Sequence, residues 1–194
     1  MIETILAVGF TSAVYLAYIK RLIQERDALK DKATHDPLTG LANRSLFHDR
    51  LSSKVDYSTR YGAGLAIMII DLDGFKHVND TYGHAAGDFL LQVIAGRINA
   101  CTRSNDTVVR LGGDEFAIIL PEIDNDRSAI TIANKIINTI AESVIINGRE
   151  VSVTASIGIA LHSRYGSSAD ELIESADLAM YSAKNNGKNS YRLA

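Results

Sequence analysis

The sequence predicts an α+β fold of the ferredoxin-like type, with a mixed sheet that carries its helices on one face. Three observations lead to this prediction. The run Leu65–Ile70 is entirely apolar, which is typical of a central strand covered on both sides. Gly112 and Gly113 separate two alternating apolar runs and indicate a tight hairpin. With the amphipathic segments between the strands, the element order becomes β-α-β-β-α-β.

The individual elements follow from caps, turn residues and hydrophobic periodicity. Asn43 is a good N-cap for a helix that runs to about Arg60. Further helices are predicted at about residues 74–79, 85–101, 126–143 and 169–186. Strands are predicted at about residues 64–73, 107–111, 115–120, 150–162 and 190–193.

Composition limits the possible functions. The 194 residues carry a net charge of −3 and no long basic block, so we expect no nucleic-acid partner, because duplex binding needs clustered Lys and Arg. Cys101 is the one cysteine, which excludes an intramolecular disulfide and a cysteine-rich zinc site. We expect it to be a small core residue.

The N-terminal segment differs from the rest of the chain. Residues 5–19 carry no charge, and Lys20 and Arg21 follow at once. A helix over residues 1–19 would be about 28 Å long, close to the hydrocarbon thickness of a bilayer. The two cations would keep the remaining chain in the cytoplasm. We therefore expect an N-terminal helix that anchors the chain at the inner membrane. The alternative is an apolar helix that packs on a partner or on a second copy.

A linker connects this segment to the main domain. Residues 20–34 are rich in helix formers with a fragmentary heptad pattern, so a short parallel coiled coil and a solvated connecting helix both remain open. Pro37 disfavours helix at the preceding residues, and Asp36–Gly40 has the composition of a turn. We therefore divide the chain into residues 1–35 and a domain of residues 36–194.

Carboxylates follow the apolar strand and the hairpin glycines. Asp71 and Asp73 end the strand, and Asp114 and Glu115 follow the turn. Asp73 also suits the N-cap of the next helix. If the two strands are neighbours, Asp71 and Asp114 converge, and such a pair repels unless a cation lies between them. Mg²⁺ with substrate phosphates fits this description and would suit displacement at phosphorus.

The hairpin Arg110–Phe116 resembles the signature of the GGDEF family of diguanylate cyclases. Other stretches resemble the family's motifs in the same order: Asp36–Leu41, Asp71–Lys76, Asn79–His84 with Gly87 and Asp88, Ser156–Ala160, and Ala176–Asn189. The resemblance covers about residues 36–194. It implies a sheet of the nucleotidyl-cyclase type and the condensation of two GTP molecules into cyclic di-GMP.

The resemblance also implies a metal site. Asp71, the Leu72 carbonyl and Asp114 would hold Mg²⁺, with Mn²⁺ as a possible substitute. Asp114 and Glu115 would be the catalytic carboxylates. Glu115 would either assist at the metal or help to deprotonate the attacking 3′-hydroxyl, and both tasks remain open.

By the same resemblance, Asn79 and Asp88 would bind guanine. A carboxylate can accept the N1–H and 2-amino donors of guanine together, which favours GTP over ATP. Without the other motifs both residues would pass as helix caps. Lys184 and Lys188 are four residues apart at a predicted helix end, so they should share a face near the terminal phosphates. Further expected substrate contacts are Phe75, Lys76, Leu91, Gly112 and Gly113.

Arg103 and Asp106 have the spacing and position of the family's product-inhibition site, where cyclic di-GMP would bind. Taken alone, this pair would be a surface ion pair of little energetic weight. Since each domain would hold one GTP, the resemblance implies a homodimer. The alternatives are a catalytically silent module that binds cyclic di-GMP or GTP, and a membrane-bound scaffold. Retention of Asp71, Asp114 and Glu115 favours the enzyme.

Overall fold

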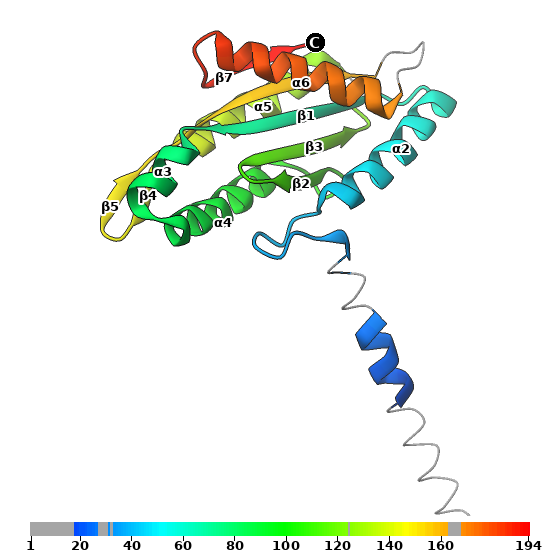
Figure 1. Cartoon of the computed structure of the whole chain (residues 1–194). Helices are drawn as coiled ribbons and strands as arrows, with labels where there is room; N and C mark the ends of the chain where they lie inside the picture. Colours follow the sequence, from blue (N-terminus) through cyan, green and yellow to red (C-terminus); the bar gives the residue numbers. More distant parts are fainter. Residues whose placement is uncertain (1–17, 27–30, 32, 124, 163–167) are drawn as a thin grey trace, which may run out of the picture.

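The computed structural model describes residues 18–26, 31, 33–123, 125–162 and 168–194. Within them, a central sheet is covered by helices (Figure 1). The elements in chain order are α2 (Arg44–Tyr61), β1 (Leu65–Asp73), α3 (Phe75–Tyr82), α4 (His84–Cys101), β2 (Thr107–Gly112), β3 (Glu115–Pro121), α5 (Asp126–Ala141), β4 (Val144–Ile146), β5 (Arg149–Val151), β6 (Thr154–Leu161), α6 (Ala169–Asn185) and β7 (Ser190–Leu193).

The sheet has the strand order β2-β3-β1-β6-β7. The pairs β2–β3, β3–β1 and β1–β6 are antiparallel, while β7 runs parallel to β6. The first four strands of this order have the ferredoxin-like arrangement, and the parallel edge strand makes the sheet mixed. The predicted α+β fold with a mixed sheet is therefore confirmed.

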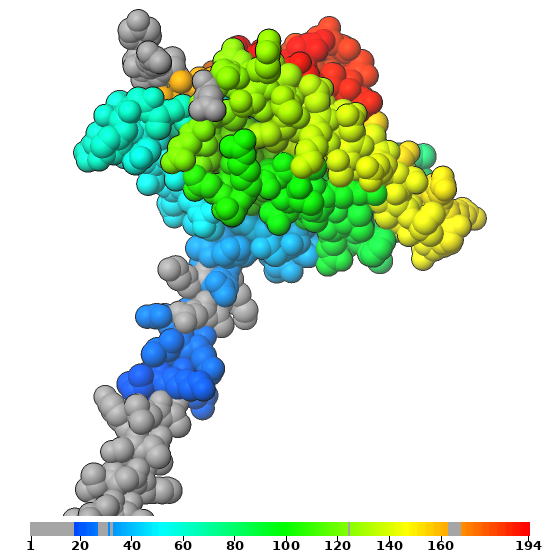
Figure 2. Space-filling view, turned by 180° about the vertical axis from the view of Figure 1, so that it is seen from behind, coloured from blue at the N-terminus to red at the C-terminus, as the bar shows by residue number. Residues whose placement is uncertain are grey.

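Helices cover both faces of the sheet, so the expectation that they lie on one face was wrong. Ala66, Met68 and Ile70 of β1 belong to the core formed with α4 and α5. Leu65, Ile67 and Ile69 belong to the core formed with α2 and α6. Alternate side chains of a strand point to opposite faces, so the unbroken apolar run of β1 requires a cover on each side. From behind, α4 and α5 form much of the surface (Figure 2).

Helix α6 packs closely on β6, beside the site described below. A Cβ atom at Gly158 would lie 1.9 Å from the Ala176 carbonyl oxygen and 2.3 Å from the Met180 backbone nitrogen. Glycine is therefore required at this position, and α6 cannot lift away from the sheet without losing this contact.

One predicted strand was wrong. Residues 150–162 form β5 and β6, and β5 pairs with β4 in a separate two-stranded hairpin. Asn147 and Gly148 connect β4 to β5 with φ values of 51° and 75°, as expected for an Asn-Gly turn with positive φ at both residues. Figure 2 shows this hairpin projecting from one end of the domain.

At the N-terminal side, residues 18–26 are helical. The predicted turn at Asp36 is present, with the Thr39 backbone N–H donating to Asp36 Oδ1 at 2.9 Å. Within the described residues, no helix is both long and apolar enough to cross a bilayer. Residues 1–17, which contain most of the predicted anchor, lie outside the described part.

Candidate active site

The carboxylates singled out from the sequence lie together at one end of the sheet. Asp71 of β1 is the cross-strand partner of Glu115 of β3. The Leu72 backbone N–H donates to the Asp114 carbonyl oxygen at 3.3 Å, which places the hairpin turn beside the end of β1. The structure therefore brings Asp71, Asp114 and Glu115 together, as the neighbouring strands required.

Lys184 of α6 reaches the same point. Its Nζ lies 2.7 Å from Asp71 Oδ2, and the two side chains are 30% and 11% exposed. Burial raises the pKa of Asp71, and the charges of Asp114 and Asp73 add to this, while the ion pair with Lys184 opposes it. The Lys184 ammonium group thus offsets part of the negative charge of Asp71, Asp73 and Asp114.

Glu115 is more open, with a side chain 43% exposed. Burial raises its pKa, and the charges of Asp71 and Asp177 raise it further, against the opposing charge of Arg44. Arg44 Nη2 lies 3.9 Å from Glu115 Oε2, and its Nε donates to the Leu111 carbonyl oxygen at 3.3 Å. Arg44 was missed in the sequence, where it is one of three arginines in the same helix.

A second arginine, Arg110, holds the hairpin turn by hydrogen bonds. Arg110 donates from Nε and Nη2 to the Gly113 carbonyl oxygen, at 3.0 and 2.8 Å. Its Nη1 lies 3.1 Å from both carboxylate oxygens of Asp36. Burial alone would raise the pKa of Asp36, but hydrogen bonds from Thr39 and then Arg110 outweigh it and lower the pKa. The turn at the domain boundary is thereby tied to the Gly-Gly turn.

Asp73 has a structural role, and its predicted use as a helix cap was wrong. Its carboxylate accepts hydrogen bonds from Thr154 Oγ1 and Ser156 Oγ, both at 2.8 Å, and from the Asn189 backbone N–H at 3.1 Å. Gly74 occupies the N-cap position of α3. Asp73 therefore connects β1, β6 and the turn before β7.

The expected guanine-binding residues lie on α3 and α4. Asn79 packs so closely on Gly87 that a Cβ atom there would lie 1.9 Å from Asn79 Oδ1. Asp88 is exposed on α4, one residue further along. Neither residue is a helix cap, since Gly74 and Gly83 hold the N-cap positions of these helices. The capping alternative is thus excluded, while their role toward guanine stays a prediction.

The remaining expected substrate contacts differ in burial. Phe75 of α3 and Leu91 of α4 are buried, and Lys76 of α3 is exposed. Gly112 and Gly113 have φ values of 143° and 55°, in the region that favours glycine. Both glycines are exposed, so the backbone of the hairpin turn is accessible to a ligand.

Lys188 does not share a helical face with Lys184, and that prediction was wrong. Helix α6 ends at Asn185, and Lys188 adopts a left-handed conformation with φ 62° in the turn before β7. Its backbone N–H donates to the Ala183 carbonyl oxygen at 3.1 Å. The side chain is exposed, so it remains available to a ligand from the turn.

The donor set fits Mg²⁺ better than a softer metal. Asp71, Asp114 and Glu115 offer carboxylate oxygens, and Leu72 offers a carbonyl oxygen. Mg²⁺ in nucleotide sites is held by one or two carboxylates with substrate phosphates rather than by an all-protein cage. Among the described residues, no group of three or more acidic, His or Cys side chains is arranged to hold a metal ion by itself.

Arg103 and Asp106 lie in the turn between α4 and β2. The Arg103 backbone N–H donates to Asp106 Oδ2 at 2.7 Å, and both residues border a small hollow next to the end of β3. The Arg103 side chain is exposed. The structure therefore brings the pair together, and its binding of product stays a prediction.

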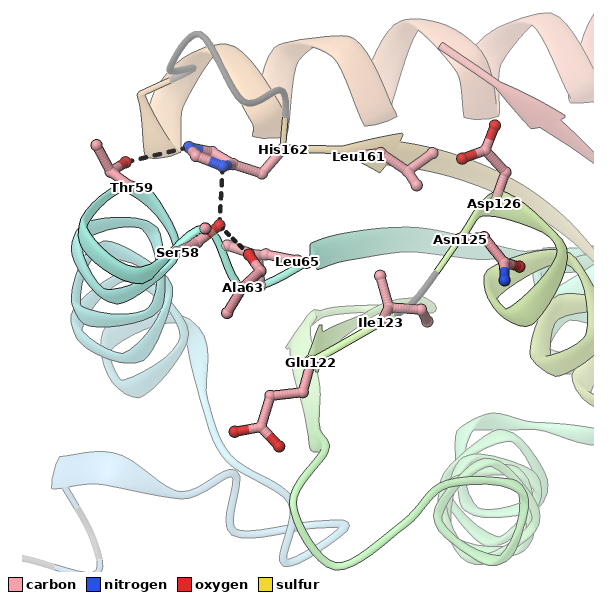
Figure 3. Close-up of a pocket in the computed structure, with 12 residues that line it drawn as sticks. Ser58, Thr59, Ala63, Leu65, Glu122, Ile123, Asn125, Asp126, Leu161 and His162 are labelled. Carbon is pink, nitrogen blue, oxygen red and sulfur yellow. Dashed lines mark hydrogen bonds between the residues drawn. The ribbon is translucent and has the colours of Figure 1, made fainter.

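A larger hollow, of about 940 Å³, lies at the opposite end of the sheet (Figure 3). Leu65 at the start of β1 lines it, together with Glu122 and Asp126, and His162 Nδ1 lies 3.0 Å from Ser58 Oγ. The described residues around it include no Lys or Arg. The described lining offers a triphosphate two carboxylates and no Lys or Arg, so the carboxylate cluster at the other end is the better candidate.

The fold and the cluster define a nucleotidyl-cyclase-type α+β domain with an acidic, lysine-flanked site. The sequence model of the family described as "Diguanylate cyclase, GGDEF domain" matches residues 33–190. The chain belongs to the GGDEF family of diguanylate cyclases.

Curated relatives support this membership. The diguanylate cyclase TpbB of Pseudomonas aeruginosa is 42% identical over 175 residues, which are 90% of this chain and 40% of that protein. The bifunctional diguanylate cyclase/cyclic di-GMP phosphodiesterase MucR of the same species is 46% identical over 159 residues, which are 82% of this chain and 23% of that protein. The chain thus spans less than half the length of these two relatives.

Solved structures agree with the fold. The coiled coil and GGDEF domain of DgcB from Caulobacter crescentus, in complex with cyclic di-GMP, superimposes with a TM-score of 0.89 at 28% identity, covering 96% of this chain and 99% of that one. The GGDEF domain of TpbB gives a TM-score of 0.80 at 42% identity and covers 82% of this chain and 94% of that one.

Proposed function

We propose that this chain is a diguanylate cyclase, which condenses two GTP molecules into one cyclic di-GMP and releases two pyrophosphates. The observation that carries the proposal is the convergence of Asp71, Asp114 and Glu115 beside Lys184. This arrangement provides oxygen ligands for a divalent cation and one ammonium group for phosphates, on a domain of the cyclase family.

The chemistry is a pair of displacements at phosphorus. The 3′-hydroxyl of each GTP attacks the α-phosphorus of the other, a new phosphodiester forms, and the bond to pyrophosphate breaks. The hydroxyl proton must pass to a base. Glu115 suits this task by its position, since it is the cross-strand partner of Asp71, and in the metal-free protein burial and the charges of Asp71 and Asp177 raise its pKa.

Asp71, Asp114 and the Leu72 carbonyl would hold Mg²⁺ or Mn²⁺, with Glu115 as a further ligand in the alternative to its role as base. The bound ion would neutralise phosphate charge and lower the pKa of the attacking hydroxyl. Lys184 and Lys188 would hold the terminal phosphates as point charges.

Asn79 and Asp88 would select guanine, whose N1–H and 2-amino donors match a carboxylate. Phe75 and Leu91 would support the base from the buried side. Lys76 would be a further phosphate ligand, and Gly112 and Gly113 would contact the substrate from the hairpin turn. The close packing of Asn79 on Gly87 supports this part of the proposal, because it holds the amide in one place.

The reaction requires two such sites that face each other, so the active species would be a homodimer with its two-fold axis between the sites. Product feedback would act through Arg103 and Asp106. Its support is the motif in the turn before β2 and the cyclic di-GMP complex of the related Caulobacter crescentus domain.

Contact with the inner membrane through residues 1–19 rests on the uncharged run that Lys20 and Arg21 follow. Cell fractionation tests it. Anchoring predicts recovery in the membrane fraction and release by detergent but not by high salt, and full recovery without detergent would contradict it.

The proposed activity is tested by incubating the purified 194-residue chain with GTP and Mg²⁺ and separating the nucleotides by chromatography. Asp114→Asn and Glu115→Gln should each lower product formation by about 100-fold or more, the order expected when a metal ligand or base is removed. Glu150→Gln, on the exposed hairpin strand β5, is the matched control and should be unchanged. Equal activity of all three variants would contradict the assignment of the site.

A further inference from the structure

Arg44 is the first residue of α2 and borders the carboxylate cluster from the side of the hairpin. Its Nη2 lies 3.9 Å from Glu115 Oε2, which is too far for a hydrogen bond. Its Nε donates to the Leu111 carbonyl oxygen at 3.3 Å, so the head group is held beside the Gly-Gly turn. The proposed reaction assigns the phosphates to lysines and leaves this guanidinium group without a task.

An ion pair of this kind contributes little to the stability of the fold. The side chains of Arg44 and Glu115 are 61% and 43% exposed, and exposed pairs are worth at most about 1 kcal/mol. Arg44 therefore loses little when it exchanges Glu115 for another anion. A guanidinium group binds phosphate especially well, because its N–H donors match two phosphate oxygens at once.

Arg44 and Lys184 approach the cluster from opposite sides. Helix α2 packs mainly on β2 and β3, and α6 packs mainly on β6, β1 and β7, which are the two halves of the sheet. Lys184 accordingly meets Asp71 of β1, while Arg44 meets Glu115 of β3. The two neighbouring carboxylates thus have one cation on each flank.

These two sides correspond to two different nucleotides. Lys184 and Lys188 would hold the terminal phosphates of the GTP bound in their own domain. Glu115 would act on the 3′-hydroxyl of the other GTP, which is bound by the facing domain, so that GTP must approach the Glu115 side of the cluster. Arg44 stands on this side, with most of its side chain exposed.

We propose that Arg44 acts in trans: it binds the α-phosphate of the GTP held by the facing domain. There, the 3′-oxygen of the other GTP forms a bond to the α-phosphorus, the bond to pyrophosphate breaks, and the hydroxyl proton passes to a base. A guanidinium group at this phosphate stabilises the negative charge of the transition state. The role of Arg44 rests on the proposed cyclase function, and each site is complete only with the arginine of the partner.

Rates and binding of single variants of the 194-residue chain test this role. Arg44→Gln should lower kcat by about 100-fold, the order expected when one group that stabilises the transition state is removed. Measured on monomeric chain, its Kd for Mg²⁺ with a non-hydrolysable GTP analogue should equal that of wild type, because a domain's own nucleotide does not meet its own arginine. Arg44→Lys should recover only part of kcat, since lysine lacks the bidentate geometry. Arg60→Gln, in the last turn of the same helix, is the matched control and should change neither quantity.

A mixture of Arg44→Gln and Asp114→Asn chains separates action in trans from action in cis. In a mixed dimer, the Arg44→Gln chain supplies an intact metal site, and the Asp114→Asn chain supplies the arginine that serves it. One phosphodiester bond can therefore form, and the second cannot. The mixture should yield one pyrophosphate and the linear dinucleotide, which keeps one 5′-triphosphate, at least about tenfold faster than either variant alone.

A wild-type chain that makes cyclic di-GMP while Arg44→Gln keeps its full kcat would overturn the role of Arg44 and leave the cyclase function intact. A slow Arg44→Gln whose mixture gives no linear dinucleotide would assign Arg44 to the reaction of its own domain and overturn action in trans. A wild-type chain that makes no cyclic di-GMP would refute the cyclase function, and the role of Arg44 with it. Equal melting temperatures of Arg44→Gln and wild type, expected for an exposed pair, would show that a lower kcat does not come from a loss of fold.

Discussion

The Nζ atom of Lys184 lies 2.7 Å from Oδ2 of Asp71, where the end of β1 meets α6. Lys184 is a candidate phosphate ligand, and Asp71 is a candidate metal ligand. In the absence of both ligands the two side chains neutralise each other. When metal and nucleotide bind, this ion pair must therefore break, because Asp71 then contacts the metal ion and Lys184 contacts the phosphates.

Lys184→Gln should change metal and nucleotide binding in opposite directions. Without the nearby ammonium charge, Mg²⁺ alone should bind at least about threefold more tightly, because a neighbouring positive charge opposes a cation by a few kcal/mol or less at a partly exposed site. Binding of Mg²⁺ with a non-hydrolysable GTP analogue should weaken by about tenfold. Titration calorimetry measures both quantities.

Lys188→Gln is the control for this exchange, since Lys188 lies in the turn after α6. It should weaken the binding of nucleotide and leave the binding of Mg²⁺ alone unchanged. If Lys184→Gln instead weakens the binding of Mg²⁺ alone, Lys184 does not compete with the metal ion for Asp71, and the proposed exchange of partners is refuted.

Glu115→Gln should stabilise the metal-free protein at neutral pH. The pKa of Glu115 is raised by burial and by Asp71 and Asp177, so the folded state binds its proton more tightly than the unfolded state does. Relative to the variant, the wild type therefore loses stability as the pH rises from the pKa of Glu115 in the unfolded chain through its higher pKa in the folded protein. Urea denaturation with EDTA, at pH values between about 4 and 8, measures the difference.

The stability difference should shrink as the pH falls and the wild-type carboxyl becomes protonated. Glu150→Gln, on an exposed strand, should show no such pH dependence. A Glu115→Gln protein that is less stable than wild type at neutral pH would contradict the electrostatic account of the cluster.

Asp36→Asn should destabilise the domain by about 2 kcal/mol, the order expected for a lost hydrogen bond between charged groups. The side chains of Asp36 and Arg110 are only 17% and 12% exposed, so solvent compensates little. Hydrogen bonds lower the pKa of Asp36 in the folded protein despite its burial. The stability difference between wild type and Asp36→Asn should therefore be fully present above the pKa of Asp36 in the unfolded chain, and it should disappear as the pH falls through its pKa in the folded protein.

Chemical denaturation of Asp36→Asn tests the contribution of the Asp36–Arg110 ion pair. Asp56→Asn, on the exposed face of α2, is the control. Arg110 also holds the Gly113 carbonyl, so turnover of Asp36→Asn should fall together with stability. Full stability of the variant would show that the turn and the hairpin are independent.

Gly87→Ala should weaken GTP binding through Asn79. The added methyl group would lie 1.9 Å from Asn79 Oδ1, so the amide must turn away from its position. We expect the KM for GTP to rise by about tenfold, or about 1.4 kcal/mol. Gly96→Ala, in the same helix with open space around it, should leave the KM unchanged and add up to about 1 kcal/mol of stability. An unaltered KM in Gly87→Ala would argue against Asn79 as a guanine ligand.

Much of the fold could be predicted because its signals are local. The apolar run of β1, the Gly-Gly turn and the Asn43 cap each correspond to an element of the structure. The hairpin of β4 and β5 was missed although Asn147 and Gly148 carry its turn signal. The break between β5 and β6 falls at residues 152–153, which include no Gly or Pro, so the sequence carries no local signal that divides the predicted strand.

Contacts between distant segments could not be predicted from local patterns. Lys184 and Asp71 are 113 positions apart in the sequence, and their ion pair depends on how closely α6 sits on β6, which Gly158 permits. Arg44 reaches Glu115 only because α2 begins beside the hairpin. Periodicity places such residues on a helix but does not say which carboxylate they meet.

The most direct test of the central claim is the stoichiometry of the reaction as protein concentration varies. The 194-residue chain with GTP and Mg²⁺ should yield cyclic di-GMP and pyrophosphate in a ratio of one to two. The rate per protomer should rise with protein concentration, because two sites must meet. GTP that stays intact at a concentration where the chain is dimeric, or that yields only GDP and phosphate, would contradict the account.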